Sequence, residues 1–157
     1  MAVPDHAEYE LVGPVPEAPG AGHYPSRTKA RKAALDILFE ADARGVSALA
    51  VWDERLRAAE TPLRELTTQI VRGWAENAAE LDDLVADCLV RGWTFERMPA
   101  VDRNLCRIAA FEVMHTETPA EVAASDAVRL AGDLSTDGSA SFVNAIVAEI
   151  IRRHRAT

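Results

Sequence analysis

Apolar residues recur with a helical period along the chain from residue 26 onward. Over residues 26–45 they fall at i, i+3, i+4, i+7, i+8 and i+11, which is one face of an α-helix. They are Ala30, Ala33, Ala34, Ile37, Leu38 and Ala41. Ser26 or Thr28 can cap the start, and Gly45 suits the left-handed residue that often follows a helix. The pattern predicts a core helix over residues 26–45.

Local breaks divide the next part of the chain. Ser47 is placed to cap a second helix, and Thr61-Pro62 has the N-cap residue followed by proline that starts many helices. The apolar period after Pro62 fits one long helix or two helices broken near Asn77. Gly92 is expected to end this segment.

The last third of the chain repeats the helical pattern. Helices are predicted over residues 101–116, from Pro119 onward and over residues 141–154, the last being apolar enough to be the most buried. Residues 134–141 form a loop rich in Ser, Asp and Gly. No stretch shows convincing strand alternation. The sequence therefore predicts an all-α fold, a compact bundle of about seven helices.

The first 25 residues differ from the rest of the 157-residue chain. They hold five of the eight prolines, with no apolar periodicity. We expect a disordered acidic arm over residues 1–25 and one helical domain over residues 26–157. The arm is an inert extension or a weak shield for the bases that follow it. No signal peptide or membrane span is visible, and Cys88 and Cys106 suit free thiols in a reducing cytoplasm.

Charge is unevenly distributed. The net charge is −8, yet residues 27–32 carry four bases and no acid, and these include both lysines of the chain. The helix dipole disfavours cations near a helix start and acids, here Glu40 and Asp42, near its end. Each charge near a helix end typically changes helix stability by about 0.3–1 kcal/mol. A function other than helix stability therefore explains the cluster, and phosphate binding fits it. The alternative is a charge run that only faces water.

Signals for catalysis are sparse. The chain has no GxSxG, P-loop or GxGxxG motif. Glu112 and His115 have the Glu-x-x-His spacing of di-iron bundles, but a second copy is absent from the sequence. We expect no enzyme activity, no metal and no cofactor, and a metal-dependent bundle enzyme is the rival hypothesis.

Four segments of the chain carry a resemblance when they are taken together. The segments are Arg27-x-x-Ala30-Arg31 with Ala34, Leu38-Phe39 and Asp42; Val101-Asp102-Arg103-x-Leu105-x-Arg107-Ile108-Ala109 with Phe111-Glu112; Pro119-x-x-Val122 with Asp126-Ala127-Val128-x-Leu130-Ala131; and Ser141-Phe142-Val143-Asn144-x-x-Val147. Each segment alone is a weak signal. In this order and spacing they resemble the NusB family of transcription antitermination factors, in its actinobacterial branch, over about residues 26–152.

The resemblance implies an all-helical fold and a function without catalysis or cofactor. NusB-like proteins bind the boxA element of nascent RNA together with the ribosomal protein NusE. The pair helps to load an antitermination complex onto RNA polymerase, chiefly at ribosomal RNA operons. Family members are monomers or homodimers, so the resemblance leaves the oligomeric state open. The alternative function is a helical protein-interaction module that does not bind RNA.

The resemblance also implies which residues bind RNA. Phe142 is placed to stack on an unpaired base, or else it only anchors the last helix. Ser139 and Asn144 lie beside it and are expected to read base edges or to cap the helix. The phosphate contacts implied by the family's arginine-rich segment are Arg27, Lys29, Arg31 and Lys32.

Two further residues match positions where the family meets NusE. They are Asp102 and Arg103, although Asp102 also suits the first turn of a helix as an acid. The chain departs from the family at Ala145, where Gly is usual, and at Asp126, where Glu is common. Neither departure removes a contact that the resemblance implies.

Overall fold

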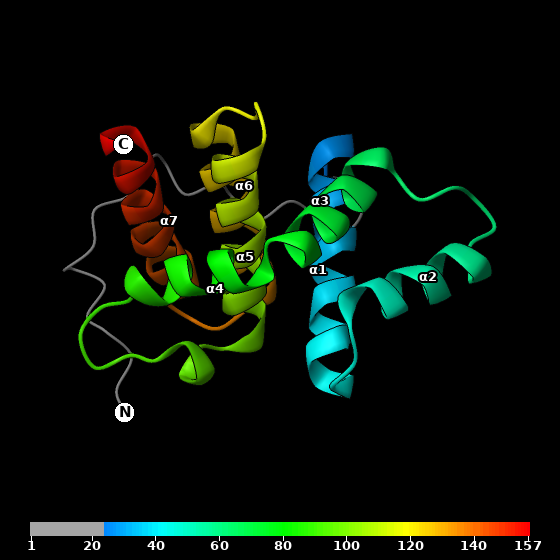
Figure 1. The fold of residues 1–157 in the computed structure, drawn as a ribbon, viewed down its shortest axis with the longest axis horizontal. Coiled ribbons are helices and arrows are strands. Elements are labelled where there is room, and N and C mark those ends of the chain that lie inside the picture. Colours follow the sequence, from blue (N-terminus) through cyan, green and yellow to red (C-terminus); the bar gives the residue numbers. More distant parts are fainter. Residues whose placement is uncertain (1–23) are drawn as a thin grey trace.

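The computed structural model describes residues 24–157, and every regular element in that part of the chain is a helix (Figure 1). The predicted all-α bundle is thereby confirmed. The arm predicted over residues 1–25 lies almost wholly outside the described residues. The elements are α1 (Ser26–Arg44), α2 (Ala48–Ala58), α3 (Glu65–Glu76), α4 (Ala78–Asp87), the short 3-10 helix η2 (Phe95–Arg97), α5 (Ala100–His115), α6 (Ala120–Leu134) and α7 (Ser139–Ala156).

Helix α5 forms the centre of the bundle. It packs against α6 and α7 on one side and against α1 and α3 on the other, and α4 crosses it (Figure 1). Every residue from 104 to 113 is buried. A helix that is covered all round must pair its polar side chains internally. The most buried element is therefore α5, whereas the sequence pattern favoured the last helix.

Local end signals explain several helix boundaries. Gly45 follows α1 with φ 67°, and its N–H donates to the carbonyl of Asp42, so this predicted helix end is confirmed. The Ser47 side chain accepts from the N–H of Ala50 and caps α2, which was also predicted. The start of α1 differs, because Pro25 occupies the N-cap position and no side chain caps it. The Thr28 hydroxyl turns into the bundle instead.

The middle of the chain breaks at Asn77, as one interpretation of the pattern predicted. There the backbone leaves the helical region at φ −123°, which separates α3 from α4. The starts and ends around this break were predicted less well. Helix α3 begins after Arg64 rather than at Thr61-Pro62, and α4 ends at Asp87 rather than at Gly92.

The connection between α6 and α7 is shorter than the sequence predicted. Gly138 adopts φ 85° directly before Ser139, the first residue of α7. A left-handed residue at this position turns the chain abruptly, so α7 packs back along α6. None of the helices in the described part of the chain is both long and apolar enough to cross a membrane.

Candidate nucleic-acid interface

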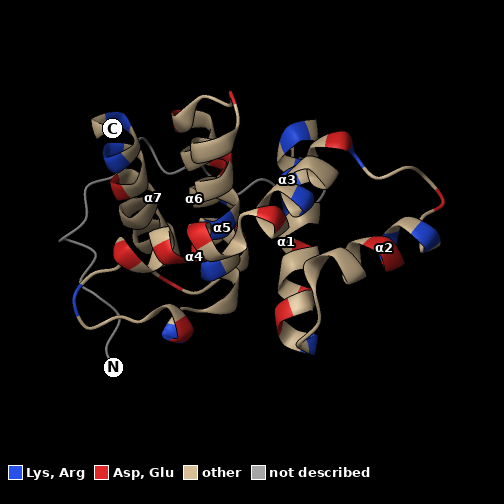
Figure 2. Ribbon diagram, in the orientation of Figure 1, with Lys and Arg blue, Asp and Glu red and all other residues tan. Residues whose placement is uncertain are grey.

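The four bases in the first turns of α1 do not face the same environment. The side chains of Arg27 and Lys29 are exposed and form no ion pair with any other residue between 24 and 157. The Nζ atom of Lys32 lies 2.9 Å from a carboxylate oxygen of Asp36, one helical turn away. Lys and Arg positions gather around the start of α1 and the nearby start of α3 (Figure 2). Two cations are therefore free to meet phosphate.

Arg31 points into the bundle and is 2% exposed. Its Nε and Nη2 atoms donate to the two carboxylate oxygens of Glu112, at 2.7 and 2.8 Å. Its Nη1 atom donates to Asp126 at 2.7 Å, and the Thr28 hydroxyl donates to the same carboxylate. Burial opposes the charge on Arg31, but these two carboxylates outweigh it and raise the pKa of the guanidinium.

The buried pairing changes the role expected for Arg31. A guanidinium that already donates to two carboxylates has no face left for a phosphate. We therefore assign Arg31 to the packing of α1 against α5 and α6, in place of the phosphate contact implied by the sequence. The same pairing occupies Glu112. Among the described residues, no group of three His, Cys, Asp or Glu is placed to hold a metal ion.

An open groove adjoins Arg27. It has a volume of about 690 Å³ and lies between Arg27, Gln69 on α3 and the turn from α5 to α6. His115, Thr116 and Thr118 supply polar atoms along it, and Glu117 adds one carboxylate. The Nε2 atom of His115 lies 3.2 Å from a carboxylate oxygen of Glu80, which holds the ring in place. Hydroxyl and amide groups beside a free guanidinium suit the phosphates and sugars of a nucleic-acid strand.

The residues expected to read bases are buried. Phe142 is 3% exposed, and its ring packs 5.0 Å from the ring of Trp93 between centroids. Ser139 and Asn144 are covered to the same degree. A base cannot stack on Phe142 without displacing its neighbours. In this structure Phe142 therefore anchors the start of α7, which is the alternative role that the sequence left open.

Asp102 is also buried, contrary to its expected position at a partner surface. It is 1% exposed, and it accepts hydrogen bonds from the hydroxyls of Ser135 and Ser139 at 2.5 and 2.9 Å. Burial raises the pKa of Asp102, and the two hydroxyl donors only partly oppose this shift. The carboxyl thus fastens the α6–α7 connection to the start of α5.

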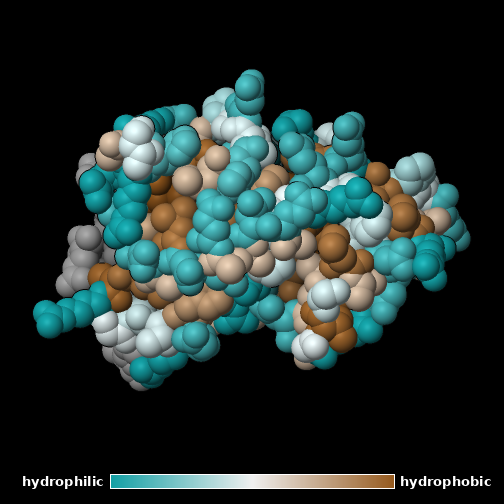
Figure 3. Space-filling view, viewed as in Figure 1, coloured by the Kyte–Doolittle hydropathy of each residue, from teal (hydrophilic) through white to brown (hydrophobic). Residues whose placement is uncertain are grey.

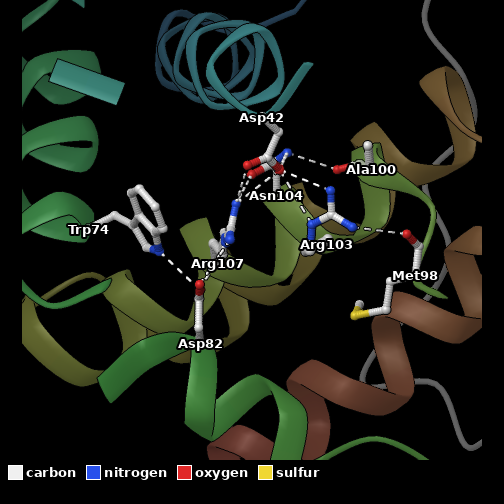
Figure 4. A network of polar contacts seen from close by, with 8 residues as sticks. All are labelled: Asp42, Trp74, Asp82, Met98, Ala100, Arg103, Asn104 and Arg107. Atoms are coloured by element: carbon white, nitrogen blue, oxygen red, sulfur yellow. Dashed lines mark hydrogen bonds and ion pairs between the residues drawn. The ribbon is translucent and has the colours of Figure 1, made fainter. Parts of the chain in front are cut away.

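Arg103 belongs to a polar network, centred on the Asp42 carboxylate, that the sequence pattern did not reveal (Figure 4). Its Nη2 atom donates to Asp42 at 3.0 Å, and its Nη1 atom donates to the carbonyl of Met98. Asn104 and Arg107 donate to the same Asp42 carboxylate. The unfavourable position of Asp42 near the end of α1 was the signal for this network, since a charge opposed to the helix dipole requires a partner.

Arg107 extends this network across the molecule. It pairs with Asp82 on α4 through Nε at 2.9 Å, and the indole N–H of Trp74 donates to the same carboxylate at 3.4 Å. The guanidinium carbon of Arg107 also lies 4.6 Å from the centre of the Trp74 ring. The network fixes α1, α4 and α5 relative to one another.

The exposed cations and Phe142 lie at opposite ends of α5. Arg27 borders the turn after His115, whereas Phe142 shares a small cavity with Pro99 and Asp102 at the other end. The 16 residues of α5 make these ends about 24 Å apart at 1.5 Å per residue. The structure therefore does not bring the predicted phosphate and base contacts together into one compact site.

Comparison with known proteins identifies the family. The model of the NusB family matches residues 28–152. The transcription antitermination protein NusB of Acidothermus cellulolyticus is 46% identical over 134 residues, which cover 85% of this chain and 91% of that protein. That of Nocardioides sp. is 44% identical over 81% of this chain and 94% of its own length. The Cutibacterium acnes protein is 46% identical over 80% of this chain, which spans only 48% of that longer relative.

Solved structures give the same fold. The structure of T. maritima NusB matches with a TM-score of 0.73 and 29% identity over 83% of this chain and 93% of its own. A chain of the crystal structure of antitermination factors NusB and NusE in complex with double-stranded RNA matches with a TM-score of 0.70 and 20% identity, over 81% of this chain and 96% of that chain. That identity supports likeness of fold alone. On the family model and the curated relatives, the chain belongs to the NusB family of transcription antitermination proteins.

Proposed function

We propose that this chain is an RNA-binding adaptor of transcription antitermination. In this proposal it binds boxA-type single-stranded RNA together with NusE in the cytoplasm. The pair then helps to load an antitermination complex onto RNA polymerase, mainly at ribosomal RNA operons. The basis is membership of the NusB family, whose relatives matched here carry the name of antitermination proteins.

One observation carries the RNA contact. In a chain with a net charge of −8, Arg27 and Lys29 are exposed and without an acidic partner in the described residues. Arg27 also borders a groove whose lining holds hydroxyl and amide groups and one carboxylate, Glu117. The first turns of a helix add positive potential to such a site. We assign phosphate contacts to these two residues, with Lys32 joining when it leaves Asp36. Arg103, 16% exposed, remains our proposed contact for NusE.

A second function is favoured by the burial of Phe142, Ser139, Asn144 and Arg31. If these residues stay covered, the chain has few groups with which to recognise bases. It would then act as a helical protein-interaction module that joins NusE without binding RNA. A homodimer that covers the start of α1 would have the same consequence.

A gel shift with boxA RNA, with and without NusE, separates the two functions. We expect the RNA to shift with the chain, and more strongly when NusE is present. Replacing Arg27 and Lys29 by Gln should weaken binding and reduce the slope of log affinity against log salt by about 0.7 for each phosphate that the variant no longer neutralises. Arg57→Gln is the matched control, because that side chain is 79% exposed at the far end of α2.

The opposite results are equally informative. An unchanged salt slope in the double variant would remove Arg27 and Lys29 from the RNA contact. Binding to NusE without any RNA shift would favour the interaction module. A Phe142→Ala protein that stays folded and binds RNA normally would leave that ring with a packing role alone.

A further inference from the structure

Arg72 on α3 is an exposed arginine that is held by an aromatic ring and has no carboxylate partner. Its guanidinium carbon lies over the Trp52 ring of α2, 4.8 Å from the ring centre. The ion pairs within residues 24–157 include neither Arg72 nor Glu76, the acid at i+4 on the same helix. Arg107 also lies against a tryptophan, but it is paired with two carboxylates. Stacking on a ring leaves the N–H donors of a guanidinium available, so Arg72 keeps them for a ligand.

The Trp52 ring is itself fixed by α3. Its indole N–H donates to the hydroxyl of Thr68 at 3.1 Å, and Thr68 lies one helical turn before Arg72. The ring is half-buried where α2 packs against α3. Because the ring is held in place, the guanidinium that lies on it is held near one position as well. A donor that is positioned before it binds loses less conformational entropy on binding.

The exposed surface of α3 joins Arg72 to the groove at Arg27. Gln69 lines that groove, and Arg72 follows it at i+3, so the two exposed side chains are neighbours on the helix surface. The Thr67 hydroxyl donates to the carbonyl of Ala30 at 2.8 Å, so α3 lies directly against α1 here. Hydrophilic residues cover the molecule over the starts of α1 and α3 (Figure 3). Arg27, Gln69 and Arg72 therefore form an exposed polar path from the start of α1 to α2.

We propose that Arg72, held by Trp52, is a further phosphate contact for single-stranded RNA, and that the strand crosses α3 between Arg27 and Arg72. The inference rests on the RNA-binding function proposed above and extends its site from α1 to the junction of α3 with α2. A polyanionic strand suits separated cations with a polar group between them, because phosphate contacts position the strand. A protein partner fits this path less well, since its three side chains offer no apolar anchor.

RNA binding by Arg72→Gln tests the proposal. The probe is a fluorescently labelled boxA RNA flanked by uridines on both sides, titrated with the full chain at several salt concentrations. We expect the slope of log affinity against log salt to fall by about 0.7, which corresponds to about fivefold weaker binding at about 0.1 M salt. Arg72→Lys keeps the charge and should restore most of the slope. Wild-type affinity and slope in Arg72→Gln would overturn the proposal.

Trp52→Leu separates the position of the guanidinium from its charge. This variant keeps Arg72 but removes the ring that holds it, so we expect weaker binding with an unchanged salt slope. Circular dichroism checks the fold of each variant. If the contact served only to pack α2 against α3, Trp52→Leu and Arg72→Gln would lower the melting temperature and leave RNA binding unchanged, which would refute the site.

Arg91→Gln is the matched control. Arg91 is also exposed and forms no ion pair within residues 24–157, and it belongs to the connection from α4 to η2, on the far side of the molecule from α2 (Figure 1). We expect this variant to bind RNA as wild type does. An equal loss in Arg91→Gln and Arg72→Gln would reduce the effect to net charge and overturn the proposal.

Two further results separate this inference from the proposed function. If wild type binds RNA and only the Arg27 and Lys29 variant loses affinity, the proposed function stands and the contact at Arg72 does not. If wild type binds no RNA, both are overturned. Arg72→Gln should bind NusE as wild type does, and a loss of NusE binding with unchanged RNA binding would make this face a protein contact instead.

Discussion

Neighbouring residues of like charge have different roles in α1. Arg27 and Lys29 face solvent, whereas Arg31 lies on the stripe that also carries Ala34 and Leu38 at i+3 and i+7. That spacing was a signal in the sequence for a buried position. The run of bases nevertheless favoured an exposed position for Arg31, because a fully buried arginine is rare unless it is paired. The partners, Glu112 and Asp126, lie 81 and 95 residues further along the chain.

The buried ion network predicts unequal effects of two arginine substitutions in the same helix. Arg31→Ala leaves two buried carboxylates without their cation, and we expect a loss of about 3–5 kcal/mol in the free energy of unfolding. Arg27→Ala removes an exposed side chain and should change it by no more than about 0.5 kcal/mol. Urea unfolding followed by circular dichroism measures both. Similar small losses in the two variants would contradict the structural role of Arg31.

At the scale of the element, α1 shows how tertiary pairs override a local preference. Glu40 and Asp42 lie near the end of the helix, where the helix dipole disfavours acids. Arg44 and Arg55 pair with Glu40, while Arg103 and Arg107 pair with Asp42. The Arg44–Glu40 pair lies within α1, while the other pairs hold α1 against α2 and α5. The two acids that oppose the helix dipole therefore form ion pairs that join α1 to neighbouring helices.

The close approach of α3 to α5 gives a test of packing between elements. A Cβ atom added at Gly73 would lie 2.1 Å from ring atoms of the buried Phe111, whereas one added at Gly132 in α6 would meet nothing closer than 3.7 Å. Gly73→Ala should therefore lower the free energy of unfolding by about 1–3 kcal/mol through overpacking. Gly132→Ala should raise it by about 0.5–1 kcal/mol, since alanine suits a helix better.

Thermal unfolding of the two glycine variants measures this contrast. The wild-type melting temperature should fall between those of the two variants. A stabilising effect of Gly73→Ala would show that α3 does not approach Phe111 as closely as the structure has it.

At the scale of the whole molecule, carboxylates tie distant helices together and set the response to acid. Burial opposes ionisation of Asp42, but Arg107, Arg103 and Asn104 outweigh it and lower its pKa from the ordinary value of 3.8. The folded chain therefore holds this proton less tightly than the unfolded chain. The stability contributed by Asp42 is complete above its ordinary pKa and is lost as the pH falls through the lowered value.

Asp42→Asn should reveal this contribution. At neutral pH we expect a loss of about 1–2 kcal/mol, after allowing for the 27% exposure of the side chain. The difference from wild type should shrink as the pH falls below about 4, because wild type then loses the same interaction. Melting temperatures over a pH series measure it, and a difference that grows in acid would contradict the assignment.

Asp102→Asn should show the opposite pH dependence of stability in the same series and serves as a control. The pKa of Asp102 is raised by burial, so its contribution to stability decreases as the pH rises from 3.8 through the raised value. Relative to wild type, this variant should therefore improve with increasing pH. An identical pH response of the two variants would show that the burial of Asp102 has no effect on its ionisation.

Local features of the sequence determined the helical class, the break at Asn77, the capping by Ser47 and the end of α1 at Gly45. Each depends on residues within a few positions of one another, through the helical period or the geometry of a helix end. The four segments that resemble NusB also indicated the family, since their order and spacing are properties of the chain itself.

The tertiary structure alone decided which polar and aromatic side chains are available for binding. The sequence does not reveal whether the side chains of Arg31, Asp102 and Phe142 are buried or exposed, because their partners come from other parts of the chain. Burial is a property of contacts between distant segments, and helical periodicity records only the local pattern that makes such contacts possible.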